Sequence, residues 1–403
     1  MLTSYIKKTV TLLVVIITVF FLSGCEKERY YKYTLVLDNA FNTINKVDIF
    51  TLGKTEQEVL KKVRDDINQI LLDLDHKFNV QDRSDNIITD LMRVNNNAGA
   101  APVVVDPEVI DVLEIALDFS QRSAVEGVAL YDPTILPVAD LWDITNRQYN
   151  YFDNNYISDE ELPEEGEIAA ALALVDYRDV IIDKEESTVF LKNEGMKIDL
   201  GSIVKGYAAD KIKVYLLDNG YNKAVIDIGR NILTVGSFVN ADLEDTPWKI
   251  GIQRPFASIF DRDYEETEII GILRVTDLSL VTSGIYEKYI LTDSGKRYHH
   301  IFDPRTGYPM NNNVASVTVI CEESVIADAL STTLFLLGIE KAMEMIDGLD
   351  FNVETIWVLQ SEEPGKDYEI YVSAGLEDNF AFNDKVESRK YVYKGVYDAQ
   401  AGN

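Results

Sequence analysis

Two stretches of the sequence combine turn-forming residues, charged residues and hydroxyl groups more densely than a plain hydrophobic core requires. Residues 299–309 read HHIFDPRTGYP, and residues 327–333 read ADALSTT. Because side chains three and four residues apart share one face of a helix, Asp328, Ser331 and Thr332 are expected to point their oxygens toward one place. Such hard oxygen ligands suit magnesium, whereas an ordinary polar start of a helix is the competing interpretation. The DPRTG run in the first stretch is equally compatible with a simple hairpin turn.

A second candidate site lies where a predicted strand passes into a predicted helix. Residues 199–210 read DLGSIVKGYAAD, and the helix is expected over residues 202–219. A glycine turn that leads into a helix presents backbone amides and the positive end of the helix dipole, so a phosphate is the natural ligand. Lys205 would add a positive charge within the first turn. The alternative is a capped helix whose glycines only permit close packing.

A third and weaker candidate is the segment ALYDPT at residues 129–134. It places the ring of Tyr131 and the carboxylate of Asp132 at a proline turn. A turn that is merely capped by Asp132 explains the same residues equally well.

The composition of the chain excludes several classes of function. Its 403 residues are 46% hydrophobic, which is enough for a sizeable core. The chain has 38 Lys and Arg against 68 Asp and Glu, and the resulting net charge of −30 repels the phosphate backbone of nucleic acids. We therefore expect no nucleic-acid partner. Two cysteines and three histidines also exclude a disulfide scaffold and a cysteine-rich zinc site.

The first 25 residues have the features of an export signal. Lys7 and Lys8 precede an apolar run over residues 9–22, which is short for a membrane span but suits a signal peptide. The run ends in Leu-Ser-Gly-Cys, similar to the lipobox of bacterial lipoproteins. We expect a lipoprotein signal peptide at residues 1–24, a lipid anchor on Cys25, a polar tether at residues 25–33, and a location on the extracytoplasmic face of the cell membrane. An uncleaved N-terminal helix with an incidental cysteine is the alternative.

From residue 34 onward the sequence predicts one α+β domain whose length permits two lobes. A capping box at Thr55–Glu58 predicts a helix that runs to about Asp75, and Asp106-Pro107 is expected to begin another. The acidic residues 158–167 are expected to form a solvated loop. Further helices are expected over residues 168–175, 326–337 and 340–347, and strands over residues 46–52, 223–227, 248–252, 269–275 and 314–320.

Taken together, these segments resemble the bacterial FAD:protein FMN transferases, the flavin transferase (ApbE) family. The pattern His-x-x-Asp-Pro-Arg-Thr-Gly-x-Pro, followed by Ala-Asp-Ala-x-x-Thr, is specific to that family. The resemblance covers most of the mature chain in the family's order, over residues 95–99, 131–134, 141–142, 199–210, 282–289, 300–309 and 327–337.

The resemblance implies a two-lobed flavin-transferase domain at residues 34–403, with mixed or antiparallel sheets and packed helices. It implies magnesium-dependent transfer of FMN from FAD to a Thr or Ser hydroxyl of an exported protein of a membrane electron-transfer system, with release of AMP. The implied FAD contacts are Leu130, Tyr131, Asp132, Asp199, Lys205 and Phe302, with Phe41 as a looser match. The implied magnesium ligands are Ser202, through its backbone, and Asp328, Ser331 and Thr332.

A hydroxyl nucleophile needs a base, and His300 is the candidate because an unperturbed histidine titrates near pH 6.5. A structural histidine in a strand is the alternative. Asp328 is expected to act with it as a catalytic residue, since its carboxylate would hold the metal against the pyrophosphate. Tyr131 and Phe302 are expected to clamp the isoalloxazine ring.

One turn departs from the family's pattern. The family commonly has Gly-Gly-Asn after the strand that follows the phosphate helix, and this chain has Gly229-Arg230-Asn231. If the missing glycine needed a positive φ, Arg230 would be strained; if it only gave clearance, the guanidinium could reach a phosphate. Two other functions therefore compete with transfer: an FAD-binding lipoprotein without activity, and a hydrolase that splits FAD into FMN and AMP.

Overall fold

The structure is a computed structural model that describes residues 28–81, 87–149, 155–258 and 261–398. The expected signal peptide and Cys25 lie outside these residues. Of the helices in the described ranges, none is both long enough and apolar enough to cross a membrane.

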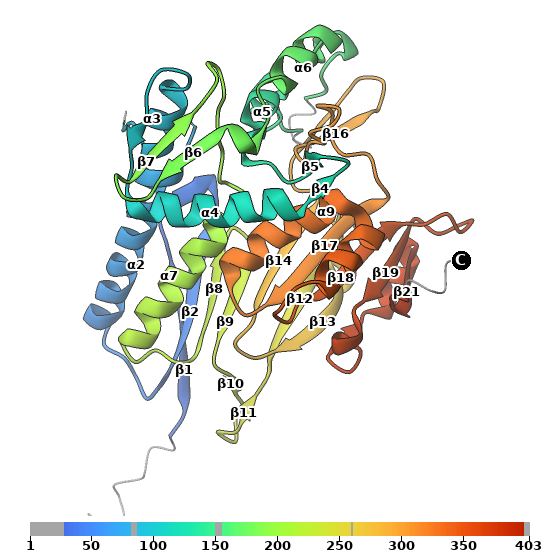
Figure 1. Ribbon diagram of the computed structural model, residues 1–403. Helices are drawn as coiled ribbons and strands as arrows, with labels where there is room; N and C mark the ends of the chain where they lie inside the picture. Colours follow the sequence, from blue (N-terminus) through green and yellow to red (C-terminus); the bar gives the residue numbers. More distant parts are fainter. Residues whose placement is uncertain (1–27, 82–86, 150–154, 259–260, 399–403) are drawn as a thin grey trace, which may run out of the picture.

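A nine-stranded mixed sheet forms the centre of the molecule (Figure 1). Neighbouring strands pair antiparallel except the last two, which are parallel. In spatial order the strands are β1 (Tyr30–Val36), β2 (Asn45–Leu52), β8 (Ala224–Ile228), β9 (Asn231–Val235), β14 (Ser279–Gly284), β17 (Val314–Cys321), β18 (Glu354–Gln360), β19 (Tyr368–Val372) and β21 (Tyr391–Val396).

Helices cover one face of this sheet (Figure 1). Helix α9 (Ser324–Asp347) packs against β14 and β17, and α7 (Val204–Asp218) packs beside α9 and against β8 and β9. Helix α2 (Gln57–Phe78) packs against α7, and α4 (Pro107–Arg122) contacts α9. Their apolar faces and the sheet share one large core.

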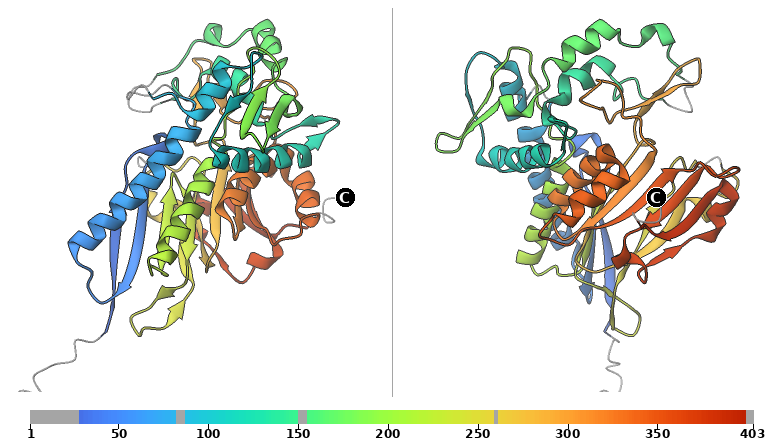
Figure 2. Two further views of the ribbon diagram at one scale, coloured as in Figure 1. Left: turned by 60° about the vertical axis from the view of Figure 1, so that its left-hand side comes forward. Right: turned by 45° about the vertical axis from the view of Figure 1, so that its right-hand side comes forward.

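A second, smaller core lies at one end of the sheet. It contains Trp142, Ile168, Ile290 and Phe302, among others. Helices α5 (Leu136–Trp142) and α6 (Glu165–Leu172) and the hairpin of β15 (Tyr289–Leu291) with β16 (Arg297–His299) gather around it (Figure 2). The two cores give the chain two lobes, and the predicted α+β class with a mixed sheet is confirmed.

The remaining strands form small sheets. A three-stranded sheet contains β12 (Trp248–Gln253), β13 (Ile269–Val275) and β20 (Phe380–Phe382), and another contains β3 (Val103–Val104), β7 (Thr188–Leu191) and β6 (Val180–Asp183). Two further pairs are β4 (Ala124–Val125) with β5 (Val128–Ala129), and β10 (Phe238–Val239) with β11 (Asp245–Thr246).

Helix starts show where local sequence decides structure and where it does not. Helix α4 begins at Pro107 as predicted, and the side chain of Asp106 accepts a hydrogen bond from the amide of Glu108 at 2.9 Å. The capping box predicted at Thr55 is wrong, because α2 begins after Glu56 without a side-chain cap. The Thr55 hydroxyl instead shares a hydrogen bond with the hydroxyl of Thr51 at 2.9 Å.

One predicted boundary is confirmed and two need correction. The two helices predicted over residues 326–337 and 340–347 are the two parts of α9, whose backbone is not helical at Gly338, with φ of +74°. The end of the acidic segment is not loop, since α6 already begins at Glu165. The predicted tether is shorter than residues 25–33, because β1 begins at Tyr30 and pairs with β2.

Candidate active site

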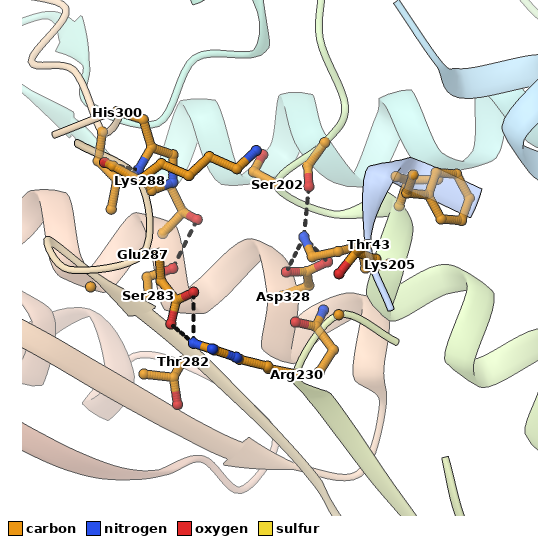
Figure 3. A pocket seen from close by; sticks show the side chains of 18 of the residues that line it. Thr43, Ser202, Lys205, Arg230, Thr282, Ser283, Glu287, Lys288, His300 and Asp328 are labelled. Carbon is orange, nitrogen blue, oxygen red and sulfur yellow. Dashed lines mark hydrogen bonds and ion pairs between the residues drawn. The ribbon is translucent and has the colours of Figure 1, made fainter. Parts of the chain in front are cut away.

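A cavity of about 580 Å³ lies between the two cores and is lined from both. It collects side chains from the start of α7, from α9, from the β8–β9 turn, and from the segment that contains His300 (Figure 3). The predicted site residues that line it are Phe41, Leu130, Tyr131, Asp132, Asp199, Ser202, Lys205, His300, Phe302, Asp328 and Thr332. Ser331 does not line it.

Gly206 brings α7 and α9 close enough to build the centre of the site. A Cβ at this position would clash with the backbone carbonyl of Ser324, so only glycine permits this approach. The Gly206 amide consequently donates to Asp328 Oδ2 at 2.9 Å. Glycine is therefore needed here for helix contact, as the packing interpretation of this motif required.

The ammonium of Lys205 lies between two oxygen groups at the start of α7. Its Nζ donates to the backbone oxygen of Gly201 at 2.8 Å and lies 3.4 and 3.5 Å from the two carboxylate oxygens of Asp328. The Asp328 side chain is only 4% exposed. A buried carboxylate needs compensating donors, and the Gly206 amide and the Lys205 ammonium supply them. This point on the cavity wall therefore suits a cation.

The hydroxyls of α9 meet at Ser283. Ser331 is fully buried and donates to the backbone oxygen of Asp328 at 2.9 Å, while its hydroxyl also lies 2.9 Å from that of Ser283. The Thr332 hydroxyl lies 3.2 Å from the same Ser283 oxygen and lines the cavity. Ser331 thus lies behind the cavity wall, and its predicted role as a metal ligand stays a prediction.

Clusters of three or more His, Cys, Asp or Glu close enough to hold a metal do not occur among the described residues. A metal in this cavity would therefore depend on Asp328 with hydroxyl and backbone oxygens. This donor set is hard and oxygen-only, which suits magnesium.

His300 is held as a neutral ring. Its backbone amide donates to the carbonyl of Lys288 at 3.2 Å, and its Nδ1 lies 3.1 Å from the same oxygen. Because a carbonyl oxygen only accepts, Nδ1 carries the proton and Nε2 keeps its lone pair. Burial, with the positive charge of Lys288 as the next cause, lowers the pKa of His300 to about 3. At neutral pH this ring can accept a proton.

The neighbouring His299 has a structural position. Its Nε2 lies 2.9 Å from the backbone oxygen of Met310, and its ring packs edge-on against Phe335. Burial lowers its pKa to about 4. It does not line the cavity, in keeping with the absence of motif support for it.

The DPRTG motif after His300 is a turn. The amides of Thr306 and Gly307 donate to the backbone oxygen of Asp303, and Phe302 bridges to Pro309 on the other side. The indole of Trp142 donates to the Gly307 carbonyl at 2.8 Å, which fixes the turn to the smaller core. The run therefore forms a turn, as the hairpin interpretation predicted.

Tyr131 and Phe302 are aromatic residues of the cavity wall. Tyr131 is 3% exposed and Phe302 is 5% exposed. The hydroxyl of Tyr131 is 3.0 Å from that of Ser202, and Phe302 packs near Trp142. Both side chains supply surface to the cavity, and their contact with a flavin ring stays a prediction.

Asp132 and Asp199 both line the cavity while making structural hydrogen bonds. Asp132 accepts from the amide and hydroxyl of Thr134 and from the amide of Tyr177, and burial raises its pKa to about 6. Asp199 accepts from the Gly201 amide at 2.9 Å, and burial raises its pKa as well. The turn-capping interpretation of Asp132 is thus correct, together with its place in the cavity.

The rim near the β8–β9 turn contains four residues with positive φ. Phe41 and Asn42 have φ of +54° and +53°, and Gly229 and Arg230 have φ of +58° and +72°. A Cβ on Gly229 would lie 2.6 Å from the Thr43 hydroxyl oxygen, so the two turns are in close contact. Arg230 occupies the left-handed region that favours glycine, and the predicted strain is confirmed.

Ser283, Glu287 and Lys288 are among the lining residues that were not predicted as site residues. They belong to the segment at residues 282–289, which matches the family but gave no role from periodicity. The available signal was a pair of opposite charges, Glu287-Lys288, within a segment that matches the family.

Comparisons with known proteins point to one family. The sequence pattern of the ApbE family matches residues 41–357. The FAD:protein FMN transferase of Klebsiella pneumoniae (strain 342) is 34% identical over 273 residues, 68% of this chain and 76% of that protein. The FAD:protein FMN transferase of Treponema pallidum (strain Nichols) is 33% identical over 308 residues, 74% of this chain and 73% of that protein.

Solved structures show the same fold. The ApbE protein of Thermotoga maritima matches with a TM-score of 0.64 at 26% identity, covering 90% of this chain and 99% of that one. The flavin transferase ApbE of Vibrio cholerae matches with a TM-score of 0.68 at 23% identity, covering 87% of this chain and 99% of that one.

Proposed function

This chain belongs to the ApbE family, and from that membership we propose that it transfers FMN from FAD to a threonine or serine hydroxyl of an exported acceptor protein and releases AMP. The curated relatives are named FAD:protein FMN transferases, and the chain is a transferase of this type. One observation supports the finer proposal. A neutral His300 and the cation position at Lys205 and Asp328 line the same cavity.

The reaction needs one bond to form and one to break. The acceptor hydroxyl oxygen bonds to the phosphorus on the FMN side of the pyrophosphate, and the bond from that phosphorus to the bridging oxygen breaks. The hydroxyl proton passes to Nε2 of His300, and AMP leaves with the bridging oxygen. Protein groups must position the pyrophosphate and balance its charge, because phosphoryl transfer depends mainly on these two effects.

The cavity offers groups for each part of FAD. The amides and Lys205 at the start of α7 suit the phosphates, since a helix N-terminus and an ammonium both attract anions. The buried rings of Tyr131 and Phe302 provide an apolar surface for the flavin or the adenine. The overall charge of −30 gives an anionic cofactor no attraction at long range, so binding depends on these local groups.

Magnesium fits the oxygens on this wall. The Asp328 carboxylate, the Thr332 hydroxyl and the backbone oxygen of Gly201, beside the predicted Ser202, are the groups that would hold it. The Lys205 ammonium, which already lies between Gly201 and Asp328, is a stand-in that supports a cation at this point. A bound magnesium ion would neutralise the pyrophosphate and polarise the attacked phosphorus.

A direct assay tests this function. The full chain, solubilised in detergent, is incubated with FAD, magnesium and several candidate exported acceptors. Acceptor mass is then measured by intact mass spectrometry, AMP is assayed, and EDTA is the control. An acceptor heavier by one FMN, equimolar AMP, and loss of both in EDTA support the proposal. Bound FAD without AMP identifies the binding protein, and AMP with free FMN identifies the hydrolase.

We also propose that Cys25 carries a lipid that anchors the protein to the extracytoplasmic face of the cell membrane. The charged start, the apolar run and the Leu-Ser-Gly-Cys box support this. Cys25→Ser should move the protein from the membrane fraction to the soluble fraction and abolish labelling by radioactive palmitate. Unchanged membrane association of this variant would favour an uncleaved N-terminal helix.

A further inference from the structure

Lys288 is a cation of the cavity for which the proposed reaction has so far had no role. It lies between β14 and β15, and its backbone carbonyl holds both the amide and the ring of His300. Its side chain extends from the His300 side of the cavity toward the Ser202 side (Figure 3). The segment that holds His300 in place therefore also places the ammonium of Lys288 across the cavity from His300.

The ammonium of Lys288 lacks the partners that the other cations of the cavity have. Lys205 is bonded to Gly201 and Asp328, and Arg230 is paired with Glu287. Within the part of the chain that the structure describes, no hydrogen bond or ion pair reaches Nζ of Lys288. Only longer-range charges act on it: Lys205 opposes its charge, and Asp199 and Glu287 favour it.

The nearby carboxylates are already engaged. Each carboxylate that lines the cavity accepts at least one hydrogen bond from another described residue. These carboxylates are Asp132, Asp199, Asp227, Glu287 and Asp328. Burial lowers the pKa of Lys288, which is the cost of desolvating an ammonium without a counter-ion. A half-buried cation that faces a cavity and is left unpaired is suited to an anionic ligand.

We propose that Lys288 binds a phosphate oxygen of the FAD pyrophosphate, in the same cavity as the cation position formed by Lys205 and Asp328. This inference rests on the proposed function for the identity of the substrate. The ammonium groups of Lys288 and Lys205 both face the cavity and would hold the pyrophosphate together, and the backbone of Lys288 links this contact to the base through its hydrogen bond with His300. Lys288 is thus a catalytic residue that makes the site selective for the pyrophosphate.

Comparing FAD with riboflavin tests this role, because riboflavin has the same ring and no phosphate. Affinities of the full chain in detergent are measured by flavin fluorescence, with EDTA present so that no metal contributes. Lys288→Met removes the charge at similar length, Lys288→Arg keeps the charge, and the exposed Lys341→Met is the matched control. We expect Lys288→Met to weaken FAD binding at least tenfold and to change riboflavin binding less than twofold. Lys288→Arg should retain most of the preference for FAD.

Two results would overturn the proposal: unchanged FAD affinity in Lys288→Met, or equal losses for FAD and riboflavin in both Lys288 variants. Should Lys288→Met fail to fold, Lys288→Arg decides, since a preference for FAD that disappears despite the retained charge counts against the phosphate contact. The transferase proposal fails separately. Unmodified protein that binds FAD but makes no AMP refutes transfer and leaves the comparison of FAD with riboflavin intact.

Discussion

Arg230 Nη1 lies 2.9 and 3.1 Å from the two carboxylate oxygens of Glu287, and this pair joins the β8–β9 turn to the segment that contains Lys288. Arg230 holds this position with a φ of +72°, in a turn where the family commonly has glycine. Its guanidinium side chain is 62% exposed, so the pair lies at the rim of the cavity. The backbone of the β8–β9 turn is therefore strained at Arg230, and the side chain of Arg230 offsets this strain only through its exposed ion pair with Glu287.

Arg230→Gly should therefore stabilise the fold. The left-handed backbone costs a non-glycine residue about 1 kcal/mol, while an exposed ion pair contributes about 0.5 kcal/mol. Arg230→Ala keeps the strain and loses the pair, so it is the matched control. We expect the glycine variant to exceed the alanine variant by about 1 kcal/mol in the free energy of unfolding, measured by denaturant titration. Equal stabilities would show that the turn relaxes without glycine.

Asp328→Ala should abolish metal-dependent transfer while the protein stays folded. The substitution removes the carboxylate of the cation position and leaves the Gly206 amide without its acceptor. Asp328→Asn keeps an acceptor oxygen for that amide and is the control for folding. Both variants should lose at least a hundredfold in kcat/KM, by analogy with the loss of one transition-state contact. Normal AMP production by either variant would remove the metal assignment.

Gly206→Ala should destabilise the protein by about 1–3 kcal/mol, because the added methyl group pushes α7 away from the Ser324 carbonyl. The same shift separates the Gly206 amide from Asp328, so FAD-dependent activity should fall as well. Gly166→Ala in α6 has open space around its Cβ and should stabilise slightly. Thermal unfolding of the two variants compares them directly, and similar melting temperatures would contradict the close contact of α7 and α9.

The pKa of His300 predicts a pH dependence. Since its pKa in the folded protein is about 3, activity should show no inflection near pH 6.5 that belongs to this ring. A kcat/KM profile of single-turnover transfer between pH 5 and 8 checks this. A bell-shaped limb near 6.5 that disappears in His300→Gln would contradict it.

The same shift affects stability, with a definite sign. A histidine with a lowered pKa binds its proton more readily in the unfolded chain, so His300 makes stability rise with pH between about 3 and its unfolded value near 6.5. Asp132, whose pKa is raised to about 6, acts in the opposite direction over part of this range. Only the difference between the unmodified chain and His300→Gln therefore reports on the ring. That difference should change by up to about 1.4 kcal/mol per pH unit.

The sequence predicted elements whose causes are local. Pro107 begins α4 because the missing amide costs nothing there, and Gly220, with φ of +83°, follows Asn219, the C-cap of α7. The motif residues His300 and Asp328 were also found, although 28 positions separate them, because their patterns are specific to the family.

Features that depend on a distant partner were not predictable. Ser331 lies behind the cavity wall and shares a hydrogen bond with Ser283 of β14, a contact between segments distant in the sequence. The Thr55 hydroxyl leaves its expected capping position for Thr51. Lys288 has no periodic pattern around it. Its proposed role in binding phosphate rests on the lack of a hydrogen-bond or ion-pair partner for its ammonium among the described residues.

Strand β1 also sets the reach of the enzyme. Its seven residues extend about 23 Å from Tyr30 toward Phe41 and the cavity, and its pairing with β2 keeps that span rigid. With a lipid on Cys25, only four residues would lie between the anchor and this rigid span. The catalytic cavity would thus lie near the end of β1 that is remote from the anchor. An acceptor hydroxyl would have to reach this height above the membrane to be modified.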